Sequence, residues 1–235
     1  MTEFHLKPVP GKLNEFCVEL DAALEAGKIS EELWFSLRRD ATEDAHLPAE
    51  NPRMQSGHSG DEARWHFTRV LMVLEAIHKD GTFLDVGCAN GYLIECVQRL
   101  VEGSWLSVAF YGLDISEGLI ELARNRLLEH PERFFCANAA TWTPDRRFDF
   151  VHAHEISYAP RNREHEFLEH LLNDYLNPGG RLIIGPWALG RDLLDMEERL
   201  SSWGYEPTGY LLKSQGDDPG LTRKMLWFDR DGNGG

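Results

Sequence analysis

The sequence predicts an α/β fold: a doubly wound, mostly parallel seven-stranded sheet with a C-terminal antiparallel hairpin, preceded by N-terminal helices. Three observations support this prediction. An apolar run at 83–86 ends in a glycine-rich turn, Gly87 to Gly91, after which apolar residues recur at helical spacing. From there, short apolar runs alternate with helically spaced ones, as in a parallel sheet covered on both faces. The last two apolar runs are separated by a turn-rich segment, 214–220, which favours a hairpin.

Two helices are predicted at the N-terminal end of the chain. Apolar residues recur at helical spacing over 13–26, and Gly27 is a natural stop. Ser30 is placed to cap the next helix, whose first turn is acidic. Residues 40–58 lose this periodicity and contain two prolines, so we expect a linker or long loop there.

A third helix is expected directly before the first strand. Ser59 and Glu62 have the three-residue separation of a capping box, and Gly81 is expected to end the helix. The segment 54–61 before it is rich in glycine and serine. It is either a loop that folds over a ligand or an ordinary approach to the helix.

The alternating part of the chain then yields the sheet. The parallel strands are expected at 83–86, 107–113, 134–137, 148–153 and 181–185. The helices are expected at 92–101, 119–128, 168–175 and 193–200. The hairpin strands are expected at 210–213 and 225–228.

Composition excludes several classes of protein. The 235 residues include 24 Lys and Arg against 39 Asp and Glu, a net charge of −15, which opposes nucleic-acid binding. The four cysteines form no CxxC pair, which is typical of reduced intracellular thiols rather than of disulfides or a zinc site. With no long apolar span and no signal-like N-terminus, we expect a cytoplasmic protein that does not enter a membrane.

Polar residues and glycines follow the first three strands, at the edge where parallel sheets bind ligands. Gly87 and Gly91 follow the first strand, and Asp114 follows the second, where a carboxylate can accept hydrogen bonds from both hydroxyls of a ribose. Asn138 follows the third strand, and its amide suits the edge of an adenine. These residues predict a nucleoside pocket. The GxxxG spacing differs from the GxGxxG of nicotinamide-binding turns.

Over about residues 59–230, the chain resembles the class I S-adenosylmethionine-dependent methyltransferases. Five ordered motifs carry the resemblance: DVGCANG at 85–91, GLDIS at 112–116, CANAATW at 136–142, FDFVHAHEI at 148–156 and LNPGGRLII at 176–184. Ala89 replaces the family's middle glycine, which costs little unless that position requires a positive φ, and Asn138 replaces the usual acid. The resemblance implies a Rossmann-like fold and S-adenosylmethionine as the cofactor. It implies that the cofactor is bound by Asp85, Gly87, Cys88, Gly91, Asp114, Ile115, Asn138, Ala139 and His154.

The implied reaction is an in-line attack of a nucleophile on a sulfonium methyl group, for which the protein mainly positions the partners. His154 and Glu155 follow the fourth strand and are the candidate catalytic residues, with His154 suited to act as a general base. Alternatively, His154 only contacts the cofactor, or one of His152 and His154 is a satisfied core histidine. We expect no metal site. His58 and Trp187 are candidates for the rim of the pocket.

Two parts are expected: an N-terminal helical extension or lid, 1–53, and a Rossmann-like methyltransferase domain, 54–235. The predicted function is methyl transfer to a small-molecule acceptor. Because residues 1–50 carry eleven acidic and five basic side chains, we expect a cationic or neutral acceptor. No NPPY-like motif follows the fourth strand, so amino-methylation of DNA bases is not indicated. An inactive cofactor-binding scaffold and an RNA methyltransferase are the alternatives; the acceptor, the methylated atom and the oligomeric state stay open.

Overall fold

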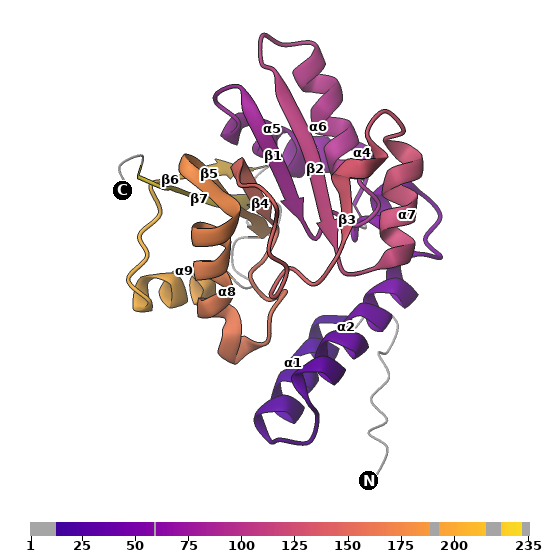
Figure 1. Cartoon of the computed structure of the whole chain (residues 1–235), viewed down its shortest axis with the longest axis vertical. Helices are drawn as coiled ribbons and strands as arrows, with labels where there is room; N and C mark the ends of the chain where they lie inside the picture. The colour runs from indigo at the N-terminus through magenta and orange to yellow at the C-terminus, as the bar shows by residue number, and fades with distance from the viewer. Residues whose placement is uncertain (1–12, 59, 189–192, 215–221, 232–235) are drawn as a thin grey trace.

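The computed structural model describes residues 13–58, 60–188, 193–214 and 222–231. Its centre is a seven-stranded sheet in the order β3-β2-β1-β4-β5-β7-β6 (Figure 1). The strands are β1 (Gly81–Val86), β2 (Val108–Asp114), β3 (Phe134–Cys136), β4 (Phe148–Ala153), β5 (Leu176–Ala188), β6 (Gly209–Lys213) and β7 (Arg223–Asp229). Neighbours among β1 to β5 pair in parallel, and β7 is antiparallel to both β5 and β6. The predicted fold, including the C-terminal hairpin, is confirmed.

Helices precede the sheet and connect its strands. They are α1 (Leu13–Glu25), α2 (Glu31–His46), α3 (Pro52–Gln55), α4 (Glu62–Trp65), α5 (Leu71–Ala76), α6 (Tyr92–Glu102), α7 (Glu117–Arg126), α8 (Glu164–His170) and α9 (Leu193–Ser202). A π-helical turn follows α4 (His66–Val70) and another follows α8 (Leu171–Tyr175). Within the described ranges, none of these helices combines the length and the apolar character needed to cross a lipid bilayer.

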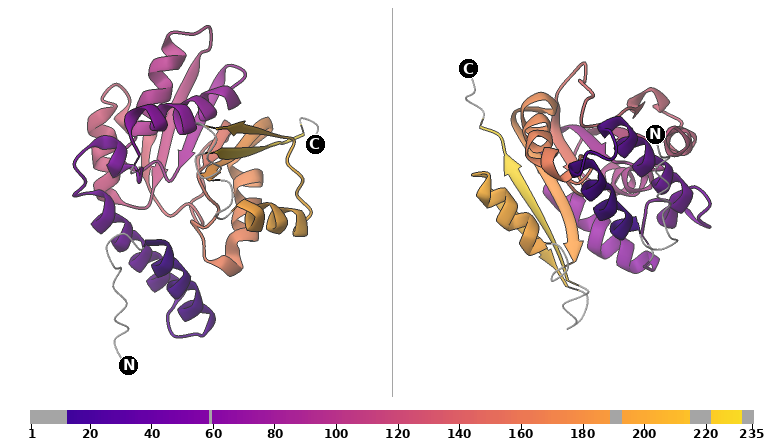
Figure 2. Two further views of the ribbon diagram at one scale, coloured as in Figure 1. Left: turned by 180° about the vertical axis from the view of Figure 1, so that it is seen from behind. Right: turned by 90° about the horizontal axis from the view of Figure 1, so that it is seen from below.

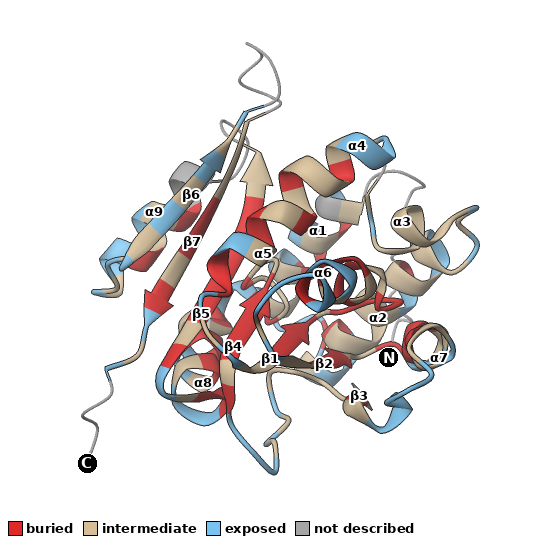
Figure 3. Ribbon diagram, turned by 90° about the horizontal axis from the view of Figure 1, so that it is seen from above, coloured by how far each residue is buried: buried red, intermediate tan, exposed pale blue. Residues whose placement is uncertain are grey.

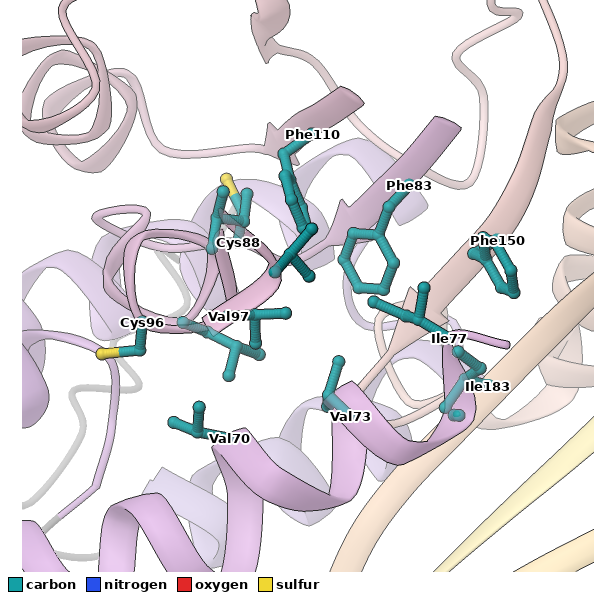
Figure 4. Close-up of a cluster of buried hydrophobic side chains, with 14 of the residues drawn as sticks. Val70, Val73, Ile77, Phe83, Cys88, Cys96, Val97, Phe110, Phe150 and Ile183 are labelled. Atoms are coloured by element: carbon teal, nitrogen blue, oxygen red, sulfur yellow. The ribbon is translucent and has the colours of Figure 1, made fainter. Parts of the chain in front are cut away.

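Each face of the sheet has its own hydrophobic core, because successive side chains of a strand point to opposite faces. Phe83 of β1 packs with α5, α6 and α7, and the next residue, Leu84, packs with α8 and α9. Figure 4 shows the first of these cores, with Val73 of α5 and Val97 of α6 directed toward Phe83. Seen from above, the central strands are largely buried and much of the outer helical surface is exposed (Figure 3). Because helices cover both faces of the sheet, a ligand site is expected at the ends of the strands.

The first two helices pack against each other at the edge to which the strands β1 and β2 point (Figures 1 and 2). They have a small core of their own around Trp34, which is fully buried and whose Nε1 donates to Asp21 Oδ1 at 3.0 Å. Ser30 caps α2 as predicted, since its Oγ accepts from the Leu33 N–H at 3.2 Å. The helices α1 and α2 therefore form a separate layer over the carboxyl edge of the sheet.

The prediction of a linker or long loop over 40–58 is wrong for 40–46 and 52–55, which are helical. Helix α2 continues to His46, and Pro52 opens the short helix α3, capped by Asn51. The apolar periodicity is lost because this end of α2 presents polar side chains, including Thr42 and His46, to a cavity. Proline is compatible with the first position of a helix, where no intrahelical N–H partner is needed.

The start and end of the next helix also differ from prediction. Asp61 caps α4 by accepting from the Arg64 N–H at 2.7 Å, and Ser59 lies outside the described residues. Helix α5 ends at Ala76, and Gly81 begins β1 instead of ending the helix. A Cβ at Gly81 would lie 2.6 Å from Asp149 Oδ2, so the glycine serves close strand packing.

Strand β5 starts earlier than predicted. It begins at Leu176, and the predicted helix break, residues 177–180, forms an irregularity where the pairing with β4 shifts register. Gly179 adopts a φ of 73°, which suits glycine in this bulge.

Candidate active site

The turn after β1 has the backbone conformation that its glycines suggest. Gly87 and Gly91 adopt φ values of 74° and 73°. At Gly87 a Cβ would lie 2.4 Å from the ring and hydroxyl of Tyr158, so a side chain there would require Tyr158 or the turn to move. Ala89 has a φ of 48°, which means that the position of the family's middle glycine does require the left-handed region.

Ala89→Gly should therefore raise the free energy of unfolding by about 0.5–1 kcal/mol, because glycine adopts this φ without Cβ strain. Urea denaturation measures the effect. Ala63→Gly, on the exposed face of α4, is the matched control and should lower stability by about 0.5–1 kcal/mol. Equal losses in both variants would show that Ala89 is not strained.

Three backbone N–H groups of this turn donate hydrogen bonds to other parts of the protein. The N–H groups of Gly87 and Cys88 both donate to the Leu113 carbonyl of β2, at 2.8 and 3.0 Å. The Ala89 N–H donates to Asp114 Oδ2 at 2.9 Å. The turn is thus locked to the end of β2, and these three amides already have partners within the protein.

Asn90 connects the turn to the segment around α3. Its side chain is fully buried, and Nδ2 donates to the Pro52 carbonyl and to Gln55 Oε1, both at 3.0 Å. Its Oδ1 accepts from Ser56 Oγ at 2.7 Å and from the Tyr92 N–H at 3.2 Å. One amide side chain therefore anchors the beginning of the 54–61 segment on the glycine turn.

A cavity of about 470 Å³ lies at the carboxyl ends of β1 to β5, beneath α2. Its walls bring together nine of the ten predicted site residues: Asp85, Gly87, Cys88, Asp114, Ile115, Asn138, Ala139, His154 and Glu155. His58 and Trp187 also line it. Gly91 does not; it is the N-cap residue that precedes α6, and a Cβ there would lie 3.1 Å from Ala123.

Asp114 presents a carboxylate to this cavity. Oδ1 accepts from the Ser116 N–H and Oδ2 from the Ala89 N–H, each at 2.9 Å. Each oxygen keeps a further lone pair for a ligand hydroxyl. Burial raises the pKa of Asp114 to about 6. At neutral pH the group is ionised and can accept two hydrogen bonds.

Asn138 uses part of its hydrogen-bonding capacity locally. Its Oδ1 accepts from the Ala140 N–H at 3.0 Å, and its backbone carbonyl accepts from the Trp142 N–H at 2.8 Å. The side-chain NH2 group is then the part with capacity left for a ligand.

Asp85 and His152 form a buried pair between β1 and β4. Asp85 Oδ1 lies 2.6 Å from His152 Nδ1, and His152 Nε2 lies 2.7 Å from the Gly185 carbonyl oxygen. A carbonyl only accepts, so Nε2 carries a hydrogen. One of the two histidines, His152 or His154, could be a core residue with all its hydrogen bonds made. His152 fits this description, because its ring connects Asp85 of β1 with the Gly185 carbonyl of β5.

His154 and Glu155 are both engaged. Arg69 Nη2 donates to His154 Nε2 at 3.0 Å, so the ring is neutral and its hydrogen is on Nδ1, which is buried without a hydrogen-bond partner. Burial and the nearby Arg69 hold the pKa of His154 well below its usual range. Glu155 is paired with Arg38 of α2 at 2.8 Å. A general base needs a free lone pair, and the Nε2 lone pair of His154 already accepts a hydrogen bond from Arg69.

A family profile described as "Methyltransferase domain" matches residues 83–180. Trans-aconitate 2-methyltransferase of Methylobacterium radiotolerans is 34% identical over 103 residues, which cover 43% of this chain and 36% of that protein. N-methyltransferase NodS of Bradyrhizobium japonicum, in complex with S-adenosylhomocysteine, has a TM-score of 0.61 at 14% identity, covering 82% and 97% of the two chains. Residues 83–180 therefore match a methyltransferase domain, and the chain shares the fold of solved methyltransferases.

A second solved methyltransferase shares the fold. It is 1,6-didemethyltoxoflavin-N1-methyltransferase of Burkholderia thailandensis, with a TM-score of 0.62 at 12% identity over 86% of this chain and 91% of that one. The alignment with the curated relative spans only about a third of that relative's length, 36%.

The segment matched by the methyltransferase profile contains only part of the cavity wall. It includes Asp85, Gly87 and Asp114, but α2 and Arg69 lie before it. Sequence reasoning missed Arg69, Arg38 and His46, because single polar residues on helices carry no motif. Among the described residues, no three His, Cys, Asp or Glu side chains are grouped so as to hold a metal ion.

Proposed function

We propose that this protein transfers a methyl group from S-adenosylmethionine to a small molecule bound in the cavity. The observation that carries the proposal is the meeting of Gly87, Asp114 and Asn138 in one cavity wall, from the ends of three neighbouring strands. The Gly87 backbone lines the part of the cavity that we assign to the cofactor's amino-acid end, and Asp114 accepts the ribose hydroxyls. The NH2 group of Asn138 lies beside the base. When bound, the cofactor supplies an activated methyl group, so the chain needs to position and enclose the reactants.

We further propose that residues 1–53 act as a lid over the methyltransferase domain, residues 54–235. Helix α2 lines the cavity, and two of its side chains contact residues that follow β2 and β4. Glu43 Oε1 accepts from Ser116 Oγ at 2.6 Å, and Arg38 pairs with Glu155 at 2.8 Å. A roofed cavity of this size suits a small acceptor better than a nucleic acid, and the net charge of −15 agrees.

Calorimetry with S-adenosylmethionine and S-adenosylhomocysteine tests the proposal. We expect both to bind, and S-adenosylhomocysteine to accumulate when a suitable acceptor is added. Failure of both ligands to bind at millimolar concentration would remove the proposed function. Binding without turnover on any acceptor would favour the inactive scaffold, and turnover on RNA with a steep salt dependence would favour the RNA methyltransferase.

The affinity for S-adenosylhomocysteine should depend on pH through Asp114. Ribose hydroxyls donate to the ionised carboxylate, and burial raises the pKa of this group to about 6. Affinity should be constant above about pH 7 and fall by up to about tenfold per unit as the pH drops below 6, because the proton must first leave. Calorimetry between pH 5 and pH 8 measures the profile. Asp114→Asn should bind more weakly at pH 8 and show no inflection near pH 6; the same inflection in both proteins would contradict this assignment.

A further inference from the structure

Arg69 is a positive charge on the cavity wall without a carboxylate partner. It belongs to the π-helical turn His66–Val70, and its guanidinium lies over the Trp65 ring, 5.4 Å from the centroid. Its Nη2 donates to His154 Nε2, and no carboxylate of the described residues forms an ion pair with it. Arg38, on the same wall, is compensated by Glu155. Arg69 thus offers the remaining N–H groups of its guanidinium to a ligand.

The surroundings of Arg69 add positive potential. Burial and the charges of Arg69, Arg53 and Arg64 lower the pKa of His58 to about 4. His58 Nε2 and His154 Nδ1 are buried and have no hydrogen-bond partner in the described structure. At neutral pH both imidazoles are uncharged, and the Nδ1–H of His154 is a donor directed away from Arg69's hydrogen bond. This end of the cavity therefore holds a cation that has no ion-pair partner among the described residues, which favours an anion.

The side chains that follow β4 do not offer a general base. The His154 lone pair accepts from Arg69, and Glu155 is held by Arg38. Burial raises the pKa of Tyr158 well above its usual range, so the phenol keeps its proton. A hydroxyl or ammonium acceptor must lose a proton to a base, and none of these three groups is placed to take it. A carboxylate is already ionised at neutral pH and needs none.

We propose that the methyl acceptor is a small carboxylic acid in its ionised form, held by Arg69. This inference rests on the proposed function. The carboxylate oxygen forms a bond to the methyl carbon, the carbon–sulfur bond breaks, and its electron pair stays on sulfur. No proton is transferred, and the product is a methyl ester. The acidic composition of residues 1–50 favoured a cationic or neutral acceptor; the charges on the cavity wall favour an anion.

Calorimetry on the complex with S-adenosylhomocysteine tests this proposal. The probes are benzoate, succinate, glutarate, adipate and citrate, each compared with its neutral amide. At least one acid should bind while its amide does not, and Arg69→Gln should weaken that binding by at least about 30-fold. Arg69→Lys should give an intermediate loss, because it keeps the charge without the planar fork. Arg99→Gln is the matched control; it removes a positive charge from an exposed position on α6 and should leave acid binding unchanged.

The cofactor also carries a carboxylate, and the same variants separate the two roles. Arg69→Gln should keep its affinity for S-adenosylhomocysteine within about threefold, which also shows that it is folded. The proposal is overturned if Arg69→Gln loses cofactor affinity by tens of fold, or if no acid binds to the wild-type complex. Failure of S-adenosylhomocysteine to bind wild-type protein would instead remove the proposed function itself. In turnover, a methylated product that survives mild alkali is not an ester and would also overturn the proposal.

Discussion

Replacing His152 by leucine is expected to lower the free energy of unfolding by about 3–5 kcal/mol, because Asp85 would remain buried without its partner. Both side chains are almost completely inaccessible, with 2% and 4% of their surfaces exposed. The Gly185 carbonyl would lose its donor in the same variant. Urea denaturation followed by circular dichroism measures the loss.

Two further variants show whether the loss comes from the unpaired carboxylate. In Asp85→Val/His152→Leu the charge and its partner disappear together, and a large part of the stability should return. His130→Leu removes a histidine whose side chain is 49% exposed, and it should change stability by less than about 0.5 kcal/mol. If the double variant is as unstable as His152→Leu, packing rather than the buried charge accounts for the effect.

Gly87→Ala should weaken the binding of S-adenosylhomocysteine by about 100-fold. The new methyl group would overlap the Tyr158 ring, 2.4 Å away, and a φ of 74° disfavours any residue with a Cβ. Movement of the turn or of Tyr158 would then disturb the cavity wall that Gly87 forms. Calorimetry measures the affinity, and thermal unfolding shows the accompanying loss of stability.

Gly103→Ala is the control for this change. Gly103 ends α6 with a φ of −85°, and the nearest atom to an added Cβ is 3.6 Å away. This variant should bind the ligand like wild type. Equal binding by Gly87→Ala would mean that the ligand does not approach this backbone.

Much of the fold could be predicted because its signals are local. Strands β1 and β4 could be predicted from their own apolar runs. The tight turn could be predicted from its glycines, 87 and 91, without knowledge of the segments that pack against it. Asp114 and Asn138 could be placed together because parallel strands end at one edge. Whether Ala89 is strained could not be predicted, because it depends on the sign of φ at this position, which a single sequence does not reveal.

The features that escaped prediction depend on contacts between distant segments. Arg38 meets Glu155 across 117 positions, and Arg69 meets His154 across 85. The Asp85–His152 pair needs the register of β1 against β4, in which these two residues are direct neighbours. The polar end of α2 looked like a loop because its partner is a cavity rather than a core.

The hydrogen bonds of Asn90 limit how this chain can be recombined with its relatives. Two of its partners are the Pro52 carbonyl and the Gln55 side chain, and a third is Ser56 Oγ. A chimera with its crossover between 56 and 90 would combine one parent's α3 with the other parent's glycine turn. Its buried amide would then face partners chosen for another sequence. Functional hybrids should therefore inherit both segments from the same parent, with the breakpoint before Asn51 or after Tyr92.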